Sequence, residues 1–248
     1  MKDEFNTARH SSDKEIINRN SFFELYSNCP IPENELLENI GLFMSRRTLS
    51  RTLFMHELYQ KIMNVHGVIM EFGVRWGKDL VMFENFRGIY EPYNYNRKII
   101  GFDTFEGFPS VNEKDGNLVK GAYSVTADYD TYLSKVLNYH ESESPISHIQ
   151  KHKIIKGNAV ETLEKYLKEH PETIISLAYF DFDIYEPTKK CLELIRGHLT
   201  KGSIIGFDEL NVREFAGETM ALKEVFGLDK YSIRRSHISP LQSYIVVE

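Results

Sequence analysis

Four carboxylates stand where two apolar runs of the sequence end. Asp181 and Asp183 close one run, and Asp208 and Glu209 close the next. Because the carboxyl ends of neighbouring parallel strands meet at one edge of a sheet, we expect these acids to crowd together. Crowded carboxylates raise each other's pKa unless a cation neutralises them. Oxygen ligands without a nearby His or Cys favour Mg²⁺ or Mn²⁺ over Zn²⁺, so the sequence predicts a hard divalent metal site.

Asp181 and Asp183 lie two residues apart, so their side chains point the same way in an extended segment. One of them can hold a metal ion while the other accepts a proton from a substrate hydroxyl that the metal has acidified. The alternative is that these acids cap the following helices and are solvated. That alternative explains any one of them more easily than all four together.

The segment from Val68 to Lys78 is an apolar run that ends in Glu71 and opens into a turn with Gly73 and Gly77. A strand, a tight turn and a helix start in this order form the first wall of a ligand crevice. A carboxylate at the strand tip would repel phosphate, but it suits a ligand with an ammonium group or hydroxyls, such as S-adenosylmethionine. The Gly-x-Gly-x-x-Gly dinucleotide fingerprint is incomplete, because position 75 is not glycine. Two glycines four apart also occur in turns that bind nothing.

The next two runs end in residues that could contact a nucleoside. Asp103 offers two acceptors to two ribose hydroxyls, and the alternative is a cap or turn Asp before Thr104. Gly157 lets the chain pass close to a flat ring whose edge the Asn158 amide can bond. Asn158 serves equally well as a helix cap, in a capping box with Glu161. The predicted cofactor-binding residues are Glu71, Gly73, Asp103, Thr104, Gly157, Asn158 and Asp181.

A parallel sheet with helices on both faces is needed to position these residues, and short β-rich runs alternate with helical stretches from Gly67 onward. Pro187 fits the first turn of the helix after the fourth strand. The last two strands are joined by too few residues for a helical crossover, so we expect them to pair antiparallel. The predicted strands cover 67–72, 97–103, 152–156, 173–181, 202–208, 230–236 and 241–247.

Two segments fall outside this alternation. Residues 1–60 carry no strand signal, and residues 34–63 have apolar residues at helical spacing with a Ser/Thr/Arg-rich interruption at 45–52. This predicts an N-terminal helical extension before a domain at 61–248. The extension would be a substrate lid, an oligomer contact or a cover for a sheet edge. The polar, Gly-rich connection 104–126 is longer than usual and could close over a cofactor.

Composition excludes several classes of protein. A chain of 248 residues suits one α/β domain with an extension, and a net charge of −6 argues against a nucleic-acid partner. Cys29 and Cys191 are too few for a disulfide framework or a thiolate cage. The sequence has no run long enough to span a bilayer and no apolar leader, so we expect a soluble cytoplasmic protein without a membrane partner. The nine histidines form no short-spaced ligand pair and are expected at surface or packing positions.

Four motifs carry a resemblance to a known family. They are Glu71-Phe-Gly73-Val-Arg-Trp-Gly77, Gly101-Phe-Asp103-Thr-Phe-Glu-Gly107-Phe-Pro109, Asp181-Phe-Asp183-Ile-Tyr185-Glu-Pro-Thr188 and Gly206-Phe-Asp208-Glu209. With them, roughly residues 65–225 resemble the macrocin O-methyltransferase family of metal-dependent enzymes, which methylate sugar hydroxyls with S-adenosylmethionine. That family usually carries Asp where this chain has Glu209, and a Gly/Ser-rich turn where it has Lys78 and Asp79.

The resemblance implies a class I methyltransferase fold, a Rossmann-like seven-stranded sheet with a terminal antiparallel strand. It implies that Glu71, Gly73 and Asp103 contact the cofactor and that Asp183 is the general base. The metal ligands that it implies are Asp181, Asp208 and Glu209. The expected substrate is a hydroxyl of a deoxysugar, glycoside or nucleotide sugar, and the expected assembly is a homo-oligomer.

Three other functions stay open. The same metal site could chelate a catechol-like phenol or another small vicinal diol. A nicotinamide oxidoreductase shares the strand-turn-helix start, but it does not explain the four acids. A non-catalytic binding module predicts lost chemistry at the strand tips, where the acids are instead present.

Four further side chains near the expected crevice are assigned more ordinary roles. Trp76 is expected to pack beneath the crevice, and contact with the cofactor is the alternative. Arg46, Arg47 and Arg51 are expected on a solvated helix face, and binding of an acceptor phosphate is the alternative.

Overall fold

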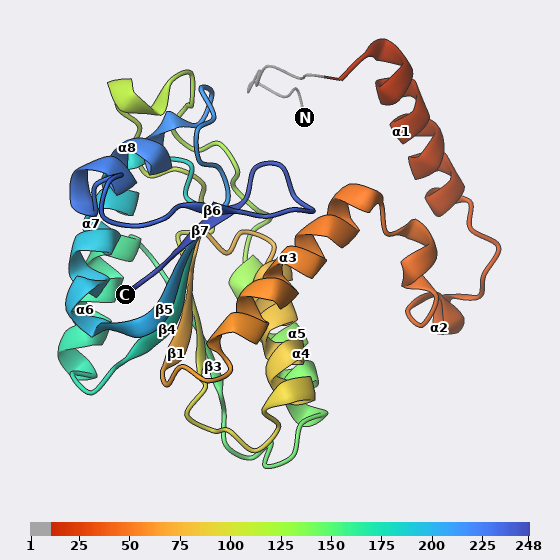
Figure 1. Cartoon of the computed structure of the whole chain (residues 1–248). Coiled ribbons are helices and arrows are strands. Elements are labelled where there is room, and N and C mark those ends of the chain that lie inside the picture. Colours follow the sequence, from red (N-terminus) through yellow and green to blue (C-terminus); the bar gives the residue numbers. More distant parts are fainter. Residues whose placement is uncertain (1–10) are drawn as a thin grey trace.

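The computed structural model describes residues 11–248, so residues 1–10, which include His10, lie outside the described part. Seven strands form one sheet in the order β3-β2-β1-β4-β5-β7-β6 (Figure 1). Pairs from β3 through β5 are parallel, whereas β7 runs antiparallel to both β5 and β6. This confirms the predicted class I sheet and its antiparallel pairing. The strands are β1 (Val68–Phe72), β2 (Ile99–Asp103), β3 (His152–Lys156), β4 (Ile175–Phe180), β5 (Leu199–Phe207), β6 (Arg234–Arg235) and β7 (Ser243–Val246).

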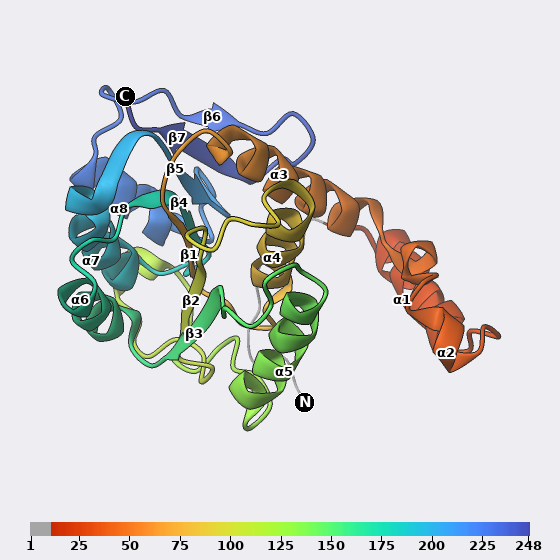
Figure 2. The same cartoon turned by 90° about the horizontal axis from the view of Figure 1, so that it is seen from below.

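Helices cover both faces of this sheet (Figures 1 and 2). One face packs against α3, α4 and α5, and the other packs against α6, α7 and α8. Every residue of β1 and of β4 is buried, which explains why these central runs are apolar without alternation. The helices are α1 (Asp13–Ser27), α2 (Glu33–Leu36), α3 (Arg46–Ile62), α4 (Lys78–Tyr90), α5 (Tyr129–Ser142), α6 (Ala159–Glu169), α7 (Tyr185–Ile195) and α8 (Ala216–Val225), with 3₁₀ turns η1 (Ile40–Phe43), η2 (Glu113–Asp115) and η3 (Arg196–His198).

The sixth strand is much shorter than the predicted 230–236. Only Arg234 and Arg235 pair with β7, and both are exposed at the edge of the sheet. Charged side chains on a short edge strand discourage pairing with another chain. The apolar and β-branched residues of 230–236 therefore predicted a longer strand than the two residues that pair at this edge.

The Ser/Thr/Arg-rich stretch 45–52, where the apolar spacing is interrupted, contains the start of a helix, because α3 begins at Arg46. Ser45 is the N-cap of α3, and its hydroxyl accepts a hydrogen bond from the Thr48 amide at 3.2 Å. Polar residues at a helix start satisfy free amides, so the Ser/Thr-rich stretch begins the helix. Because α3 continues to Ile62, no break in secondary structure marks the predicted boundary between residues 60 and 61. The division of the chain at this point stays a prediction.

Residues 11–45, which precede α3, form an arm that extends away from the sheet in both views (Figures 1 and 2). None of the residues of α1, α2 or η1 is buried, and several of their large apolar side chains are exposed, among them Phe23, Leu25 and Leu42. Within the arm, the ring of Tyr26 lies 5.0 Å from that of Phe43. The described helices include none long and apolar enough to cross a bilayer. The lid and homo-oligomer roles of the arm stay predictions.

The long connection after β2 is folded against the sheet edge. Phe108 and Leu118 pack with Ile184, which precedes α7. Asp115 in η2 accepts a hydrogen bond from the Tyr185 amide at 2.6 Å and so satisfies a free donor at the start of α7. The connection is therefore held in place over the edge where β2 and β4 end.

Candidate active site

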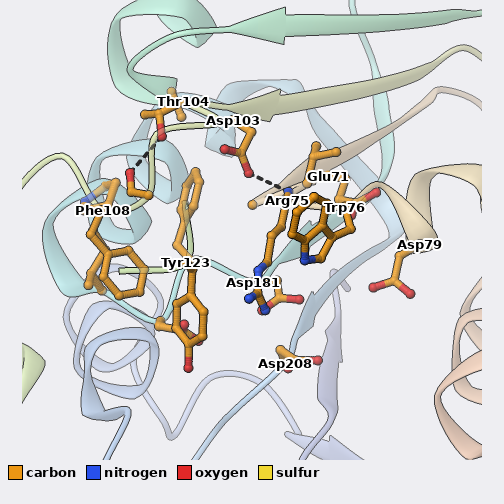
Figure 3. A pocket seen from close by; sticks show the side chains of 18 of the residues that line it. Glu71, Arg75, Trp76, Asp79, Asp103, Thr104, Phe108, Tyr123, Asp181 and Asp208 are labelled. Carbon is orange, nitrogen blue, oxygen red and sulfur yellow. Dashed lines mark hydrogen bonds between the residues drawn. The ribbon is translucent and has the colours of Figure 1, made fainter. Parts of the chain in front are cut away.

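All ten predicted site residues line one cavity of about 260 Å³ at the carboxyl ends of the central strands (Figure 3). The sequence had placed them after five separate strands, and the sheet order brings those strand ends to one edge. They are Glu71, Gly73, Asp103, Thr104, Gly157, Asn158, Asp181, Asp183, Asp208 and Glu209.

The turn after β1 requires glycine at position 73. Gly73 has φ 96°, and a Cβ there would overlap the carbonyl oxygen of Asp181. The amide of Gly73 donates to the carbonyl of Phe102, which continues the β1–β2 ladder past the strand. Gly77, with φ 77°, is the N-cap of α4. The predicted strand, tight turn and helix are confirmed, and they bring the β1 and β4 tips into direct contact.

Glu71 at the tip of β1 is a buried carboxyl with an unmet hydrogen-bonding need. It is 1% exposed, and its Oε2 atom has no hydrogen-bond partner among the described residues. Burial, together with the charges of Asp79 and Asp181, raises its pKa well above the ordinary value. Buried polar groups are normally paired, so this carboxyl is available to a donor group of a ligand in the cavity.

Asp103 and Thr104 hold the turn after β2. One Asp103 oxygen accepts a hydrogen bond from the Arg75 amide at 2.7 Å (Figure 3), and the other accepts one from the Phe105 amide at 2.6 Å. The Thr104 hydroxyl donates to the carbonyl of Gly107 at 2.8 Å. The turn role of Asp103 is therefore observed. Because each carboxylate oxygen can accept a second hydrogen bond, the ribose role stays a prediction.

The β3 tip has the helix-cap geometry that the sequence indicated. Asn158 is the N-cap of α6, and its side chain accepts from the Val160 amide at 3.0 Å. A capping box would use the amide of Glu161 as the donor. Here the donor is the Val160 amide, so the cap differs from the predicted box. Gly157 has φ 137°, and its amide donates to the carbonyl of Asp103. The capping role is observed, and cofactor contact at this tip stays a prediction.

The four acids meet as predicted. Asp181, Asp208 and Glu209 each offer a carboxylate oxygen, and these atoms lie within 4.8 Å of one another. Burial raises the pKa of Asp181 to about 7, helped by the charge of Asp208 and opposed by Arg51. The Oε2 atom of Glu209 is buried and has no hydrogen-bond partner among the described residues. This orphaned oxygen and the all-oxygen donor set fit a hard divalent cation.

Asp183 is held next to Glu209 in an unusual backbone conformation. Asp183 has φ 61° and is 7% exposed. Burial raises its pKa well above the ordinary value, although a hydrogen bond with Glu209 opposes the rise. Left-handed backbone at a non-glycine residue is strained and persists only when surrounding structure fixes it. Here α8 provides that support, because a Cβ on Gly217 would overlap the Asp183 carbonyl.

Glu218 in α8 fixes both acid-bearing turns, and the sequence did not identify it. It is fully buried, and its two oxygens accept from the Phe182 amide at 3.1 Å and the Glu209 amide at 3.4 Å. Burial, aided by the charge of Glu209, raises its pKa. No motif marks this residue, since its role depends on how α8 packs against the sheet edge.

Arg51 corrects the expectation of a solvated helix face. Its guanidinium contacts the carboxylates of Asp79, Asp181 and Asp208, and its side chain is only 14% exposed. The sequence did contain the signal. Arg51 precedes Met55 by four residues on the face of α3 that enters the core. Arg46 and Arg47 are exposed as expected, although Arg47 also lines the cavity.

Trp76 does not pack beneath the crevice. It is 42% exposed, lines the cavity and meets the ring of Tyr129 edge-on at 4.8 Å. The indole lies in a short turn, where no second layer of structure covers it. The alternative interpretation, contact with a bound molecule, stays a prediction.

A second cluster of ionisable side chains lies away from the cavity. It consists of Glu84, Glu141 and His152, which are close enough together to hold a metal ion. Arg87 and Lys151 are both fully buried beside it and form ion pairs with Glu141. These two cations already compensate the acids. We therefore interpret the group as a structural link between α4, α5 and β3.

Comparisons with known proteins place the chain among methyltransferases. No family model matches it, and no curated protein sequence matches it. The crystal structure of CalS11, a calicheamicin methyltransferase, is 44% identical, with a TM-score of 0.92 over 96% of this chain and 94% of that chain. The apo structure of CalS11, described as a TDP-rhamnose 3'-O-methyltransferase, is 41% identical, with a TM-score of 0.85 over 96% of each chain. The O-methyltransferase NovP is 15% identical, covers 80% of this chain and 79% of that chain with a TM-score of 0.56, and shares the fold.

The identity to CalS11 extends over nearly the whole chain, well beyond the motifs at the strand tips. The structural match therefore covers the sheet and the helices on both of its faces. The chain belongs to the macrocin O-methyltransferase family and is an S-adenosylmethionine-dependent O-methyltransferase.

Proposed function

We propose that the protein methylates a sugar hydroxyl in a deoxysugar, a glycoside or a nucleotide sugar, with Mg²⁺ or Mn²⁺ as the second cofactor. The main observation behind this proposal is that the carboxylates of Asp181, Asp208 and Glu209 lie close together in the cavity that Asp183 also lines. The relative described as a TDP-rhamnose 3'-O-methyltransferase supports a nucleotide sugar as the first acceptor to test.

The cofactor would lie across the tips of β1, β2 and β3. Glu71 is the buried acceptor there, and an ammonium or hydroxyl donor of S-adenosylmethionine would satisfy it. Asp103 would accept the ribose hydroxyls with its remaining lone pairs, while Arg75 and Phe105 amides fix its orientation. Gly73 and Gly157 would let the backbone approach the ligand closely.

Asp181, Asp208 and Glu209 would hold the divalent ion. When bound, such an ion lowers the pKa of a hydroxyl held beside it. The orphaned oxygen of Glu209 would gain a partner, and the mutual repulsion that raises the pKa of these acids would be relieved.

Asp183 would act as the general base. Its backbone is fixed by its neighbours on α8, so its carboxylate has a defined position in the cavity. It would accept the proton of the acceptor hydroxyl as that oxygen attacks the sulfonium methyl group. A carbon–oxygen bond forms, the carbon–sulfur bond breaks, and S-adenosylhomocysteine leaves with the electron pair. A carboxylate held beside the acceptor hydroxyl is suited to this proton transfer.

Methyl transfer assays with defined acceptors test this function. We expect transfer from labelled S-adenosylmethionine to TDP-rhamnose with Mg²⁺ or Mn²⁺, and loss of most of that activity after chelation. Catechol is the comparison acceptor, since it offers two oxygens without a sugar. Faster transfer to catechol would favour the vicinal-diol alternative, and full activity in chelator would contradict the metal-dependent mechanism.

A further inference from the structure

Arg51 occupies the same group of carboxylates that we assign to the metal ion. Its Nη2 atom lies 2.6 Å from Asp181 Oδ2 and 2.6 Å from Asp79 Oδ2, and its Nη1 atom contacts Asp208 Oδ1. Two of these three partners, Asp181 and Asp208, are proposed metal ligands. The guanidinium is thus the cation that neutralises the acid cluster in this structure.

A guanidinium and a divalent ion cannot both sit among these acids at low cost. Cations a few ångströms apart repel strongly where water is largely excluded, and Arg51 has a side chain only 14% exposed. Mg²⁺ also demands near-ideal octahedral geometry with oxygen ligands, so a carboxylate shared with a guanidinium is a poor ligand. Occupation by one cation therefore opposes occupation by the other.

Asp79 is a partner that Arg51 could keep after releasing the other two acids. Both Nε and Nη2 of Arg51 bond to Asp79 Oδ2, at 2.9 and 2.6 Å. Asp79 is 4% exposed, and it is not among the proposed metal ligands. Arg51 can therefore release Asp181 and Asp208 while its charge stays paired.

We propose that Arg51 is a resident counter-ion which the divalent ion displaces onto Asp79, so that Arg51 sets the affinity of the metal site. This inference rests on the proposed metal site, and it adds a residue that acts against ion binding. In the absence of ion, Arg51 compensates the charges of Asp181 and Asp208, with which it pairs directly. At these two acids the protein therefore exchanges one cation for another.

Calorimetric titration of Mn²⁺ into the wild-type protein and the Arg51→Met variant tests this proposal. If Arg51 occupies the acids about 90% of the time, it weakens ion binding about tenfold, and Arg51→Met should remove that loss. Arg47→Met is the matched control, because Arg47 lies on the same helix and lines the cavity without an ion pair to these acids among the described residues. Its ion affinity should match the wild-type value.

A second measurement does not depend on how the variant folds. The Nε–H signal of Arg51 can be followed by NMR in the wild-type protein as Mg²⁺ is added. Displacement predicts that the guanidinium protons facing Asp181 and Asp208 exchange faster with solvent, while the Nε–H that bonds to Asp79 stays protected.

The outcomes separate this proposal from the metal site itself. Equal or weaker Mn²⁺ binding in Arg51→Met, with an unchanged Arg51 signal in the wild type, would overturn the displacement. Ion binding in Arg51→Met alone would support the exclusion while contradicting metal dependence of the natural enzyme. If neither protein binds ion but both bind S-adenosylmethionine, the metal site and the displacement both fail, and the cofactor site stands.

Discussion

Asp183→Asn is expected to lower kcat by about 10²–10⁴-fold, the usual contribution of a positioned general base. The amide keeps the size of the carboxylate but cannot accept the hydroxyl proton. Asp183 is buried, and Gly217 packs closely against its backbone carbonyl, so we expect the substituted side chain to stay in the same place. Binding of S-adenosylmethionine should be unchanged, because the predicted cofactor contacts are Asp181 and residues at the tips of β1, β2 and β3, and the substitution alters none of them.

Single-turnover methyl transfer, measured beside calorimetric cofactor binding, checks this result. Glu186→Gln is the matched control, since Glu186 is an exposed acid three residues away. Because an amide cannot accept a proton at any pH, the lower rate of Asp183→Asn should persist across the pH range. A rate within a few-fold of wild type in Asp183→Asn would assign the base to another residue.

Glu141→Ala is expected to destabilise the protein by about 3–5 kcal/mol, the typical cost of breaking a buried ion pair by removing one partner. Arg87 and Lys151 are fully buried, and both pair with Glu141. Without the carboxylate, two charges remain buried without adequate compensation. Removal of the carboxylate would also break the ionic link that joins α5 to α4 and to the residue before β3.

Urea denaturation of the two proteins measures this loss, with Glu143→Ala as the control. Glu143 is on the same segment, with a side chain 56% exposed, so its removal should change stability by less than about 0.5 kcal/mol. Although burial opposes it, the hydrogen bond from Lys151 lowers the pKa of Glu141 below its ordinary value. Its stabilisation is therefore present at neutral pH and is lost as the pH falls through that lowered pKa. A loss below about 1 kcal/mol would contradict the structural role.

The sheet and the convergence of the acids could be predicted because both follow from local patterns. Each buried strand is a short apolar run, and each acid or glycine directly follows such a run. Parallel strands place these ends at one edge, so Asp103, Asp181 and Asp208 are expected to line one cavity, as they do. The turn after β1 was predictable from its two glycines, Gly73 and Gly77, and both adopt positive φ in the structure.

The residues that the sequence analysis missed act through packing between distant segments. Arg51 reaches the acids only because α3 lies against the sheet, and Glu218 does so only because α8 packs beside the β4 and β5 tips. Asp79 was noticed as a departure from the family, but its partner is 28 residues away in the chain. Trp76, expected to pack beneath the crevice, is instead 42% exposed in the turn after β1.

Calorimetric titration with S-adenosylmethionine, once with Mg²⁺ and once with a chelator, tests the central claim most directly. The cavity at the strand tips predicts binding in both conditions, with a dissociation constant of about 1–100 μM, within the range common for enzyme substrates. The cofactor residues lie on different strands from the metal ligands except at Asp181, so removal of the ion should change this affinity little. Absence of binding in both conditions would contradict the assignment of this cavity as the cofactor site.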